Sequence, residues 1–545
     1  MGRDVKHPFP ESVHPQSTER PALGRRSFLT RLAAGGGLTL GLPSVVHANT
    51  LTARRQMALN IRIDAATLAS QRPQPTHPSN GEETLYANKI ASYSKGLPHD
   101  ALGEVDLNAY AALKLALKTM DPYDFEQIPL GSTERLVDPQ AAFAFDLEGA
   151  DSHDLAIPPA PRIAGAEAAS ELVELYWMAL ARDVAFSDYQ CDQTIFDAAA
   201  ELSTYAAFRG PRNGGVVTPD TIFRGATAGD LIGPYVSQFL WMDIPMGALL
   251  VPQRIQTFVP NLDYMTDYWE WLGIQNGDTP GPPTVDPDPR YIRNLRDLAA
   301  WVRMDGAYQA YLQACLILLG MQAPFDAGIY YTTSVTQVGW GTFGGPHIVT
   351  LLAEVVTRAL KAVWYQKWSV HRRLRPEAFG GLVHNTLTGV ATYPFNRKIL
   401  TADAVNRMLA AHGTYLLPSA YPEGSPLHPS YGAGHATVAG ACVTILKAWF
   451  DEDFVLPDTV MSDSDGMTLV PYCGPDLTVG NELNKLAANI AIGRNAAGIH
   501  YRSDYFQSIL LGEAIALTVL EEQRATYNEP VSFTLTKFDG TPVTT

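Results

Sequence analysis

Helix-period spacing of apolar residues recurs along the chain from residue 166 onward, and this pattern most constrains what the chain can fold into. It covers eight segments: 166–184, 192–208, 293–321, 347–366, 401–411, 435–450, 482–491 and 504–522. In each segment apolar residues return at intervals of three and four, as in helices that bury one face. Runs of period two are few and short, at 215–218 and 533–537. The sequence therefore predicts a mainly α fold built from helical bundles, with little strand.

A link rich in proline and glycine at residues 275–290 interrupts the helical pattern. We therefore expect an N-terminal helical region over 49–290 and a C-terminal helical region over 291–545. A chain of 545 residues can bury one large core or two ordinary ones. Because bundles can share a core, we do not expect these regions to be independent domains.

The first 48 residues have the layout of an export signal. Arg25 and Arg26 are followed by a short, glycine-rich apolar run over 32–46 and then by Val46-His47-Ala48, with small residues at the cleavage positions. This order predicts a bacterial twin-arginine signal peptide over 1–48 and a protein exported already folded, to the periplasm or beyond. An ordinary amphipathic helix with a chance arginine pair is the alternative. No later segment reaches eighteen uninterrupted apolar residues, so we expect no stable membrane span.

The four cysteines fall into two classes. Cys315 and Cys442 lie in apolar helical runs and are predicted to be buried thiols, whereas Cys191 and Cys473 lie in polar surroundings and could pair after export. No CxxC motif supports zinc or thiol-redox chemistry.

Three stretches near the C-terminus each combine basic residues with histidine: 367–376 (KWSVHRRLRP), 428–435 (HPSYGAGH) and 493–504 (GRNAAGIHYRSD). The chain as a whole is acidic, with a formal net charge of −16. Local positive charge on that background indicates one anion site and no general affinity for nucleic acid or membrane. Three cations can each face a different oxygen of a tetrahedral or trigonal-bipyramidal oxyanion, while imidazoles move protons or bond the central atom.

In the first stretch, Lys367 and Arg375 are eight residues apart. On a continuous helix they would be separated by about 80° and ~12 Å, within converging reach of two long side chains. Pro376 disfavours helix at Arg375, so its guanidinium is expected at a helix end. The alternative is a solvated basic face, which would include Arg372 and Arg373 (and His371) equally well.

In the second stretch, glycines at 432 and 434 let the backbone approach a ligand closely, and a helix is expected to begin near His435. Free amides at that helix start favour an anion, and His435 can exchange a proton with it. A glycine-rich turn that merely caps the helix is the alternative.

In the third stretch, Arg494 and His500 would lie about 120° apart on a continuous helix, so their convergence needs a break that Gly498 can supply. His500 and Asp504 are four residues apart and share a helical face. A carboxylate at that place can fix the imidazole tautomer and raise its basicity. A purely structural histidine is the alternative.

Together the three stretches resemble the vanadium-dependent haloperoxidases, which share a site with the type 2 phosphatidic acid phosphatases. The spacing of eight from Lys367 to Arg375, the HRRLRPEA run, HPSYGxGH followed by AxVAGACVTILKA, and GRNxAGxHYxSD are similar to the algal bromoperoxidases and their bacterial relatives. The phosphatase pattern has a spacing of seven and a shorter PSGH. The similarity extends back through 286–318.

The resemblance implies a vanadate cofactor and a role for each matching residue. His500 would be the axial vanadium ligand, and His435 the acid–base residue at the apical oxygen. The equatorial oxygens would be held by Lys367, Arg375, Arg494 and the Gly434 amide, and Lys367 would also polarise the peroxide. Asp504 matches the last position of the signature and would support His500.

Three further positions concern the halide and the cofactor. His428 matches the additional histidine of bromoperoxidases, near the halide. Trp364 stands where algal bromoperoxidases carry arginine and fungal chloroperoxidases carry tryptophan, so the expected halide pocket of Trp364 and His428 is mixed. Ala433 replaces a serine whose hydroxyl contacts an equatorial oxygen in the family.

The resemblance implies a homo-oligomeric enzyme, a dimer or larger. It would use hydrogen peroxide to oxidise bromide or iodide to hypohalous acid, which then halogenates small organic substrates. Two other functions use the same residues. One is a periplasmic acid phosphatase with His500 as nucleophile and His435 as leaving-group acid. The other is a non-catalytic oxyanion-binding protein, suggested by Ala433.

Overall fold

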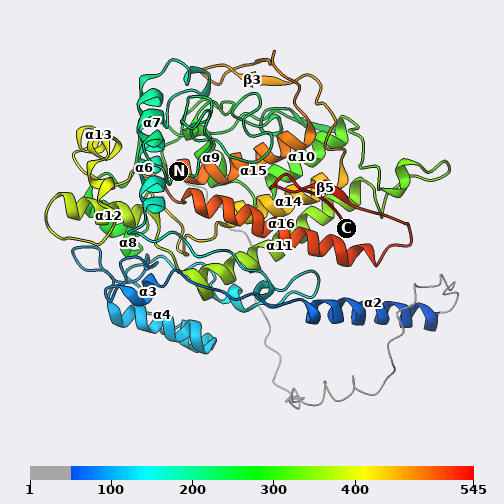
Figure 1. Ribbon diagram of the computed structural model, residues 1–545, viewed down its shortest axis with the longest axis horizontal. Helices are drawn as coiled ribbons and strands as arrows, with labels where there is room; N and C mark the ends of the chain where they lie inside the picture. Colours follow the sequence, from blue (N-terminus) through cyan, green and yellow to red (C-terminus); the bar gives the residue numbers. More distant parts are fainter. Residues whose placement is uncertain (1–50) are drawn as a thin grey trace, which may run out of the picture. The chain divides into compact units, whose positions relative to one another are not determined.

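The computed structural model describes residues 51–545, so the predicted signal peptide over 1–48 lies outside the described residues (Figure 1). By compactness the chain divides into residues 1–60 and Ile61–Thr545, and the core and the site belong to the second unit. The described helices are α2 (Leu51–Gln71), α3 (Glu82–Leu85), α4 (Leu107–Thr119), α5 (Pro122–Phe125), α6 (Ala166–Leu180), α7 (Gln193–Ser203), α8 (Tyr268–Asn276), α9 (Leu295–Met304), α10 (Gln309–Gly320), α11 (Gly345–Trp364), α12 (Pro376–Leu387), α13 (Asp403–His412), α14 (Gly434–Trp449), α15 (Val479–Ala496) and α16 (Arg502–Arg524).

Strands contribute little to the fold, as the sequence predicts. They form three antiparallel pairs: β1 (Ile244–Met246) with β2 (Leu249–Val251), β3 (Val460–Ser462) with β4 (Leu469–Pro471), and β5 (Thr534–Thr536) with β6 (Pro542–Thr544). The mainly α prediction is therefore confirmed, and β5 lies inside the run predicted at 533–537. The other predicted run, 215–218, forms only an isolated bridge between Asn213 and Val216, because Gly214 and Gly215 with positive φ turn the chain back at once.

Helix α14 lies at the centre of the bundle, where it contacts α11, α15 and α16 (Figure 1). Every residue of α14 is buried except His435, the second in the helix. Two glycines set how closely α14 approaches α16. A Cβ atom on Gly440 would lie 2.0 Å from the Ile509 carbonyl oxygen, and one on Gly512 would lie 2.0 Å from that of Thr437. The two backbones therefore touch, which fixes α16 against the start of α14.

The predicted helix over 293–321 is wrong as a single element, because the structure divides it into α9 and α10. Asp305 ends α9 in an extended conformation and Gly306 follows it. This break points the Asp305 side chain at His435. The apolar period continues across the break, so the pattern alone did not reveal it.

Residues from both sides of the 275–290 link build one hydrophobic core, which includes Trp177 and Phe239 from the N-terminal region and Leu446 and Ile509 from the C-terminal region. The link itself pairs with an earlier segment, through bridges from Ile255 to Arg290 and from Phe258 to Val285. No helix among the described residues is long and apolar enough to cross a membrane.

All four cysteines are described and none forms a disulfide, so the possible Cys191–Cys473 pair is wrong for this structure. Cys315 and Cys442 are buried thiols, as predicted, and burial raises the pKa of Cys315 to about 12.

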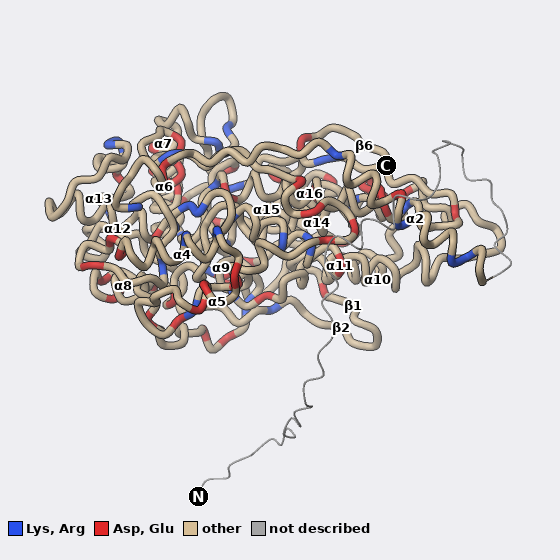
Figure 2. Tube along the Cα trace, turned by 90° about the horizontal axis from the view of Figure 1, so that it is seen from below, with Lys and Arg blue, Asp and Glu red and all other residues tan. Residues whose placement is uncertain are grey.

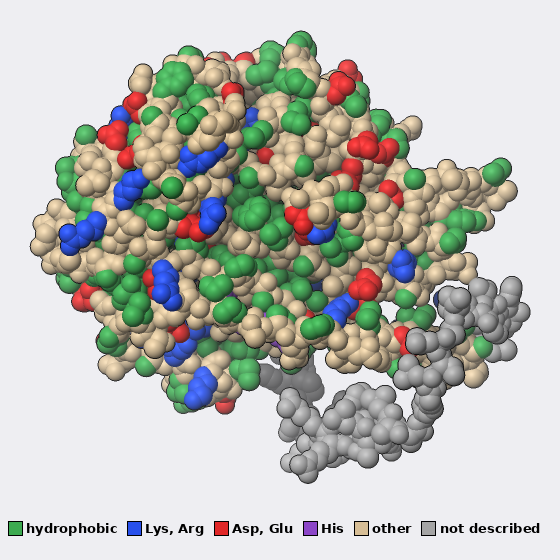
Figure 3. Space-filling view, viewed as in Figure 1, with side chains coloured by type: hydrophobic (Ala, Val, Ile, Leu, Met, Phe, Trp, Pro, Cys, Tyr) green, Lys and Arg blue, Asp and Glu red, His purple; other side chains and the backbone are tan. Residues whose placement is uncertain are grey.

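Charged residues of both signs alternate along much of the trace (Figure 2). On the face shown in Figure 3, lysine and arginine side chains stand as separate spots among apolar and acidic ones. The concentrated positive charge of the three predicted stretches lies instead in the interior, since Lys367, Arg375 and Arg494 are all buried.

Candidate active site

Lys367 projects from a π-helical turn. This turn, η6 (Tyr365–His371), continues α11, and Arg372 then adopts a left-handed conformation that ends it. The two residues are therefore not on one continuous helix, and Arg375 lies at a helix end, as predicted, as the N-cap of α12. The Lys367 Nζ donates to the carbonyl oxygens of Pro429 (2.7 Å) and Ser430 (3.2 Å), so the first stretch contacts the second.

Arg375 joins all three stretches. Its Nε donates to the His428 carbonyl oxygen (2.9 Å), and its Nη2 donates to His428 Nδ1 (2.9 Å). Its Nη1 donates to the Ile499 carbonyl oxygen (2.8 Å) and to His500 Nε2 (3.0 Å). One guanidinium thus fixes the positions of both His428 and His500.

The His500 ring is held between Asp504 and Arg375. His500 Nδ1 lies 2.8 Å from Asp504 Oδ2, as the spacing of four predicts, while Nε2 accepts from Arg375. These partners place the proton on Nδ1 and leave the lone pair on Nε2. Burial, followed by the charge of Arg375, holds the pKa of His500 well below its usual range, so the ring is neutral. A neutral imidazole with a fixed lone pair is what bonding to a metal centre requires.

Asp504 receives hydrogen bonds from four groups. Besides His500 these are the Ser430 hydroxyl, the Tyr501 amide (3.1 Å) and Arg373 Nη1 (2.7 Å). Burial opposes ionisation of this carboxyl, but Arg373 and the other donors outweigh it, and the pKa of Asp504 falls well below its usual range. Asp504 is therefore a carboxylate that orients His500.

The break that brings Arg494 towards His500 occurs where the sequence predicts it. Helix α15 ends at Ala496, and Gly498 has a φ of +84°. The Arg494 Nη1 donates to the Val302 carbonyl oxygen (2.8 Å), and its guanidinium carbon lies 5.6 Å from the centre of the Tyr421 ring. Its buried Nε has no hydrogen-bond partner among the described residues, so a donor remains available.

His435 is at the open side of the site. Helix α14 begins at Gly434, one residue before the predicted start, and the His435 side chain is 30% exposed. His435 Nε2 lies 3.1 Å from the Asp305 carboxylate. Contact with both solvent and a buried carboxylate suits a residue that exchanges protons.

The residues of the expected halide pocket, Trp364 and His428, lie together. Their ring centres are 4.8 Å apart, and Lys367 Nζ lies 5.7 Å from the centre of the Trp364 ring. Burial and the nearby cations Lys367 and Arg375 lower the pKa of His428 well below its usual range, so it is neutral. These contacts place a tryptophan and a neutral histidine beside Lys367.

Neighbouring basic residues separate into two groups by the partners they have. Arg372 is paired with Glu83, and Arg373 with Asp504 and Glu171, so the alternative of a solvated basic face is wrong. Lys367, Arg375 and Arg494, in contrast, donate to backbone carbonyls and histidine, and within residues 51–545 none of them pairs with a carboxylate.

Burial and mutual repulsion make the charged forms of these site cations less favourable. Burial lowers the pKa of Lys367 far below its usual range, and repulsion from Arg375 and Arg494 adds to this. Burial likewise lowers the pKa of Arg375 to about 10. Because a buried charge without a counter-charge is costly, this cluster favours a bound anion. Three cations, the free Arg494 Nε and the Nε2 lone pair of His500 together fit vanadate.

Sequence reasoning missed the residues that support the site. Asp305, Glu171 and the role of Arg373 come from contacts between distant segments, so no local spacing reveals them. Ser430 lies within the second stretch, but its bond to Asp504 depends on the fold.

Several known proteins are similar to this chain in both sequence and fold. A family model described as the VCPO second helical-bundle domain matches residues 347–529. The chain is 38% identical to a vanadium-dependent bromoperoxidase of Corallina officinalis, over 92% of this chain and 100% of the relative. It is 40% identical to one of Ascophyllum nodosum, over 85% of this chain and 87% of the relative. A solved structure of a second, homohexameric bromoperoxidase from Ascophyllum nodosum superposes with a TM-score of 0.87 and 30% identity, over 95% of each chain.

Proposed function

The chain belongs to the vanadium-dependent haloperoxidase family, and from that membership we propose that it uses hydrogen peroxide to oxidise bromide or iodide to hypohalous acid, which halogenates organic substrates. One observation supports this most directly. Among residues 51–545, three buried cations have no carboxylate partner, and one of them, Arg375, contacts a neutral histidine whose tautomer a carboxylate fixes.

Bound vanadate supplies a Lewis-acidic centre at which hydrogen peroxide is activated towards halide. In this proposal His500 Nε2 bonds the vanadium, and Lys367, Arg375 and Arg494 neutralise the vanadate oxygens together with the Gly434 amide. The first-turn amide of α14 is suited to this because helix starts favour anions. Carbonyl oxygens hold these three side chains in position, so little reorganisation is needed.

His435 would hold or move a proton at a bound vanadate. Its ring contacts solvent on one side, and Asp305 holds Nε2 on the other. Lys367 is proposed to polarise the peroxide, because the carbonyl oxygens of Pro429 and Ser430 hold its Nζ in place beside the other site residues.

Two assays on one protein preparation test the reaction. One follows bromination of an electron-rich dye with vanadate and peroxide, and the other follows phosphate release from a chromogenic ester. We expect vanadate-dependent bromination. Phosphate release without bromination would support the acid phosphatase, with His500 as nucleophile, and neither activity alongside tight vanadate binding would support a non-catalytic binding protein.

For the halide we propose oxidation of iodide and bromide, with chloride slow or absent. Trp364 supplies no cation for the halide, and His428, whose ring lies beside that of Trp364, would limit the oxidising power of the site by hydrogen bonding to the bound anion. We expect Trp364→Arg to lower the apparent Michaelis constant for bromide, and His428→Phe to favour chloride. Robust chloride oxidation by the unmodified enzyme at neutral pH would contradict this assignment.

We also propose that the protein is a homo-oligomer, a dimer or larger, because the Ascophyllum nodosum relative of similar fold is described as homohexameric. Light scattering of the purified protein tests this, and a monomeric mass would contradict it.

The pattern over 1–48 supports a further proposal, export through the twin-arginine route to the periplasm or beyond. Changing Arg25→Lys together with Arg26→Lys should trap the full-length protein in the cytoplasm, whereas the normal product should begin near Asn49. Export that continues after the double change would point to another route.

A further inference from the structure

A surface pocket shares a loop with the active site. The pocket has a volume of 340 Å³ and is lined by Tyr264, by α8, by the proline-rich link and by Pro422. Residues 421–423 are called the 422 loop below. The lining residues that matter for the argument are Trp269, Glu270 and Asp278. This volume lies at the lower end of the range of small-molecule sites, ~300–1,000 Å³.

The residues on either side of Pro422 contact side chains near the candidate vanadate site. Tyr421, which precedes Pro422, lies beneath the Arg494 guanidinium, and Glu423, which follows it, is paired with Arg303 of α9 (2.7 Å). Arg303 is two residues from Asp305, the partner of His435. The pocket is therefore continuous in sequence with the open side of the site.

The lining residues favour an aromatic cation. Trp269 is 69% exposed, and Tyr268 contacts its ring edge-on at 5.8 Å between centres. Glu270 and Asp278 add two carboxylates, and neither forms a salt bridge within the described part of the chain. A tryptophan face together with unpaired carboxylates is the arrangement that attracts organic ammonium groups. The net charge of −16 adds a long-range attraction for cations.

We propose that this pocket binds small electron-rich aromatic substrates that carry a cationic group, and holds them beside the site where hypohalous acid is released. The proposal rests on the haloperoxidase function. In the reaction, hypobromous acid transfers bromine to a ring carbon: the O–Br bond breaks, a C–Br bond forms, and the ring proton leaves with the hydroxide as water. A bound substrate would be brominated before the acid diffuses away.

The test compares two phenols with the same ring and opposite charge. The cationic probe is N,N,N-trimethyltyramine, whose quaternary nitrogen cannot be halogenated, and the anionic probe is 3-(4-hydroxyphenyl)propionate. Both are supplied in equal amounts with bromide, peroxide and the vanadate-loaded enzyme, and the product ratio is compared with that from reagent hypobromous acid. We expect the ratio of brominated cationic probe to brominated anionic probe to be about fivefold or more higher with the enzyme than with reagent hypobromous acid. This is the size of effect expected from a contact between opposite charges.

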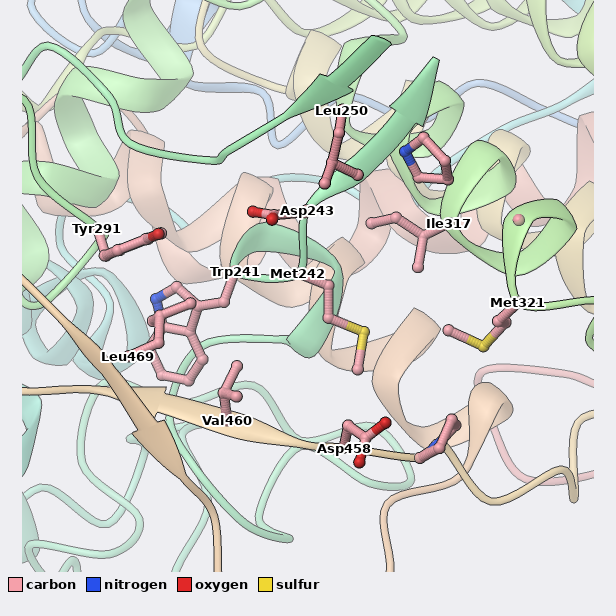
Figure 4. A pocket seen from close by; sticks show the side chains of 13 residues that line it. Trp241, Met242, Asp243, Leu250, Tyr291, Ile317, Met321, Asp458, Val460 and Leu469 are labelled. Atoms are coloured by element: carbon pink, nitrogen blue, oxygen red, sulfur yellow. The ribbon is translucent and has the colours of Figure 1, made fainter. Parts of the chain in front are cut away.

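Three variants test which residues produce the preference for the cationic probe. Glu270→Gln with Asp278→Asn, and separately Trp269→Ala, should return the product ratio to that of the reagent while bromide oxidation continues. The matched control is Asp243→Asn in a second pocket of 490 Å³, which has the same kinds of residues, including Trp241, Tyr291 and Asp458, but does not include the 422 loop (Figure 4). This change should leave the ratio unaltered.

A wild-type ratio equal to that of reagent hypobromous acid would overturn the proposal, and so would an equal loss of preference in Asp243→Asn. Either result would leave the haloperoxidase function intact, because bromide oxidation is measured in the same reaction. Absence of bromide oxidation would instead refute the function itself.

Discussion

Ala433 stands where the family resemblance implies a serine, and placing serine there should have two separable effects. Ala433 is the N-cap of α14, with φ −90° and ψ 125°, and makes no side-chain capping bond. Its own amide already donates to the Ser508 hydroxyl at 2.8 Å, and that bond does not involve the new side chain. Serine at an N-cap is worth ~1 kcal/mol more than alanine, so Ala433→Ser should stabilise the vanadate-free protein.

The same hydroxyl can donate to a bound oxyanion while it accepts from a first-turn amide. One added hydrogen bond is worth about 0.5–1.5 kcal/mol net. At 25 °C this corresponds to a vanadate dissociation constant lower by about 2- to 13-fold. Equilibrium dialysis measures that constant, and thermal unfolding of the vanadate-free protein measures the capping effect.

Glycine separates the two effects, because it is within a few tenths of a kcal/mol of serine as an N-cap but has no hydroxyl. Ala433→Gly should raise the unfolding temperature of the vanadate-free protein and leave the vanadate affinity unchanged. If the serine, glycine and alanine proteins bind vanadate equally well, the 433 side chain does not reach the anion, and our placement of the vanadate against the start of α14 is wrong.

Four other changes test the remaining roles. His500→Ala should abolish vanadate-dependent activity, and tight vanadate binding with retained activity would contradict the assignment. Lys367→Ala should leave some vanadate bound but lower turnover; if saturated turnover is unchanged, Lys367 is only a charge clamp. His435→Ala should lower turnover by about 10²- to 10⁴-fold with a smaller change in vanadate affinity, measured by dialysis. The pKa of Asp504 is lower in the folded protein than in the unfolded chain. The ionised carboxylate therefore stabilises the fold fully above the unfolded pKa of ~3.9, and this stabilisation is lost as the pH falls through the folded pKa. Asp504→Asn should flatten the acid limb of a curve of unfolding free energy against pH.

Local sequence signals predicted the elements of the fold and the chemistry of the site, because those signals act over a few residues. Apolar periodicity located α11, α14 and α16, and Gly498 marked the break before His500. Apolar periodicity did not reveal the helix end at Asp305, because the apolar period continues there although the helix does not. The sequence also showed no sign of the π-helical turn η6, which sets the direction of Lys367 without changing the pattern of residue types.

Local spacing alone could not separate the cations proposed to hold the anion from the cations that pair within the protein, because the separation depends on partners far along the chain; only the family resemblance distinguished them. Arg373 pairs with Asp504 and Glu171, and Lys95 pairs with Glu377 at 2.6 Å. Glu377 lies two residues after Arg375, and Lys95 also donates to the carbonyls of Glu423 and Ser425, so this pair fixes the segment that leads to His428.

The site cations are held differently, and the difference follows from the binding task. A carboxylate partner would neutralise a cation and compete with the vanadate oxygens, whereas a carbonyl fixes the side chain and leaves its charge uncompensated. Lys367, Arg375 and Arg494 all donate to carbonyls, while carboxylate pairs occupy the surrounding positions. Over the described residues the folded chain therefore bears the cost of three buried cations without carboxylate partners, and under the proposed function binding of the anion would relieve this cost.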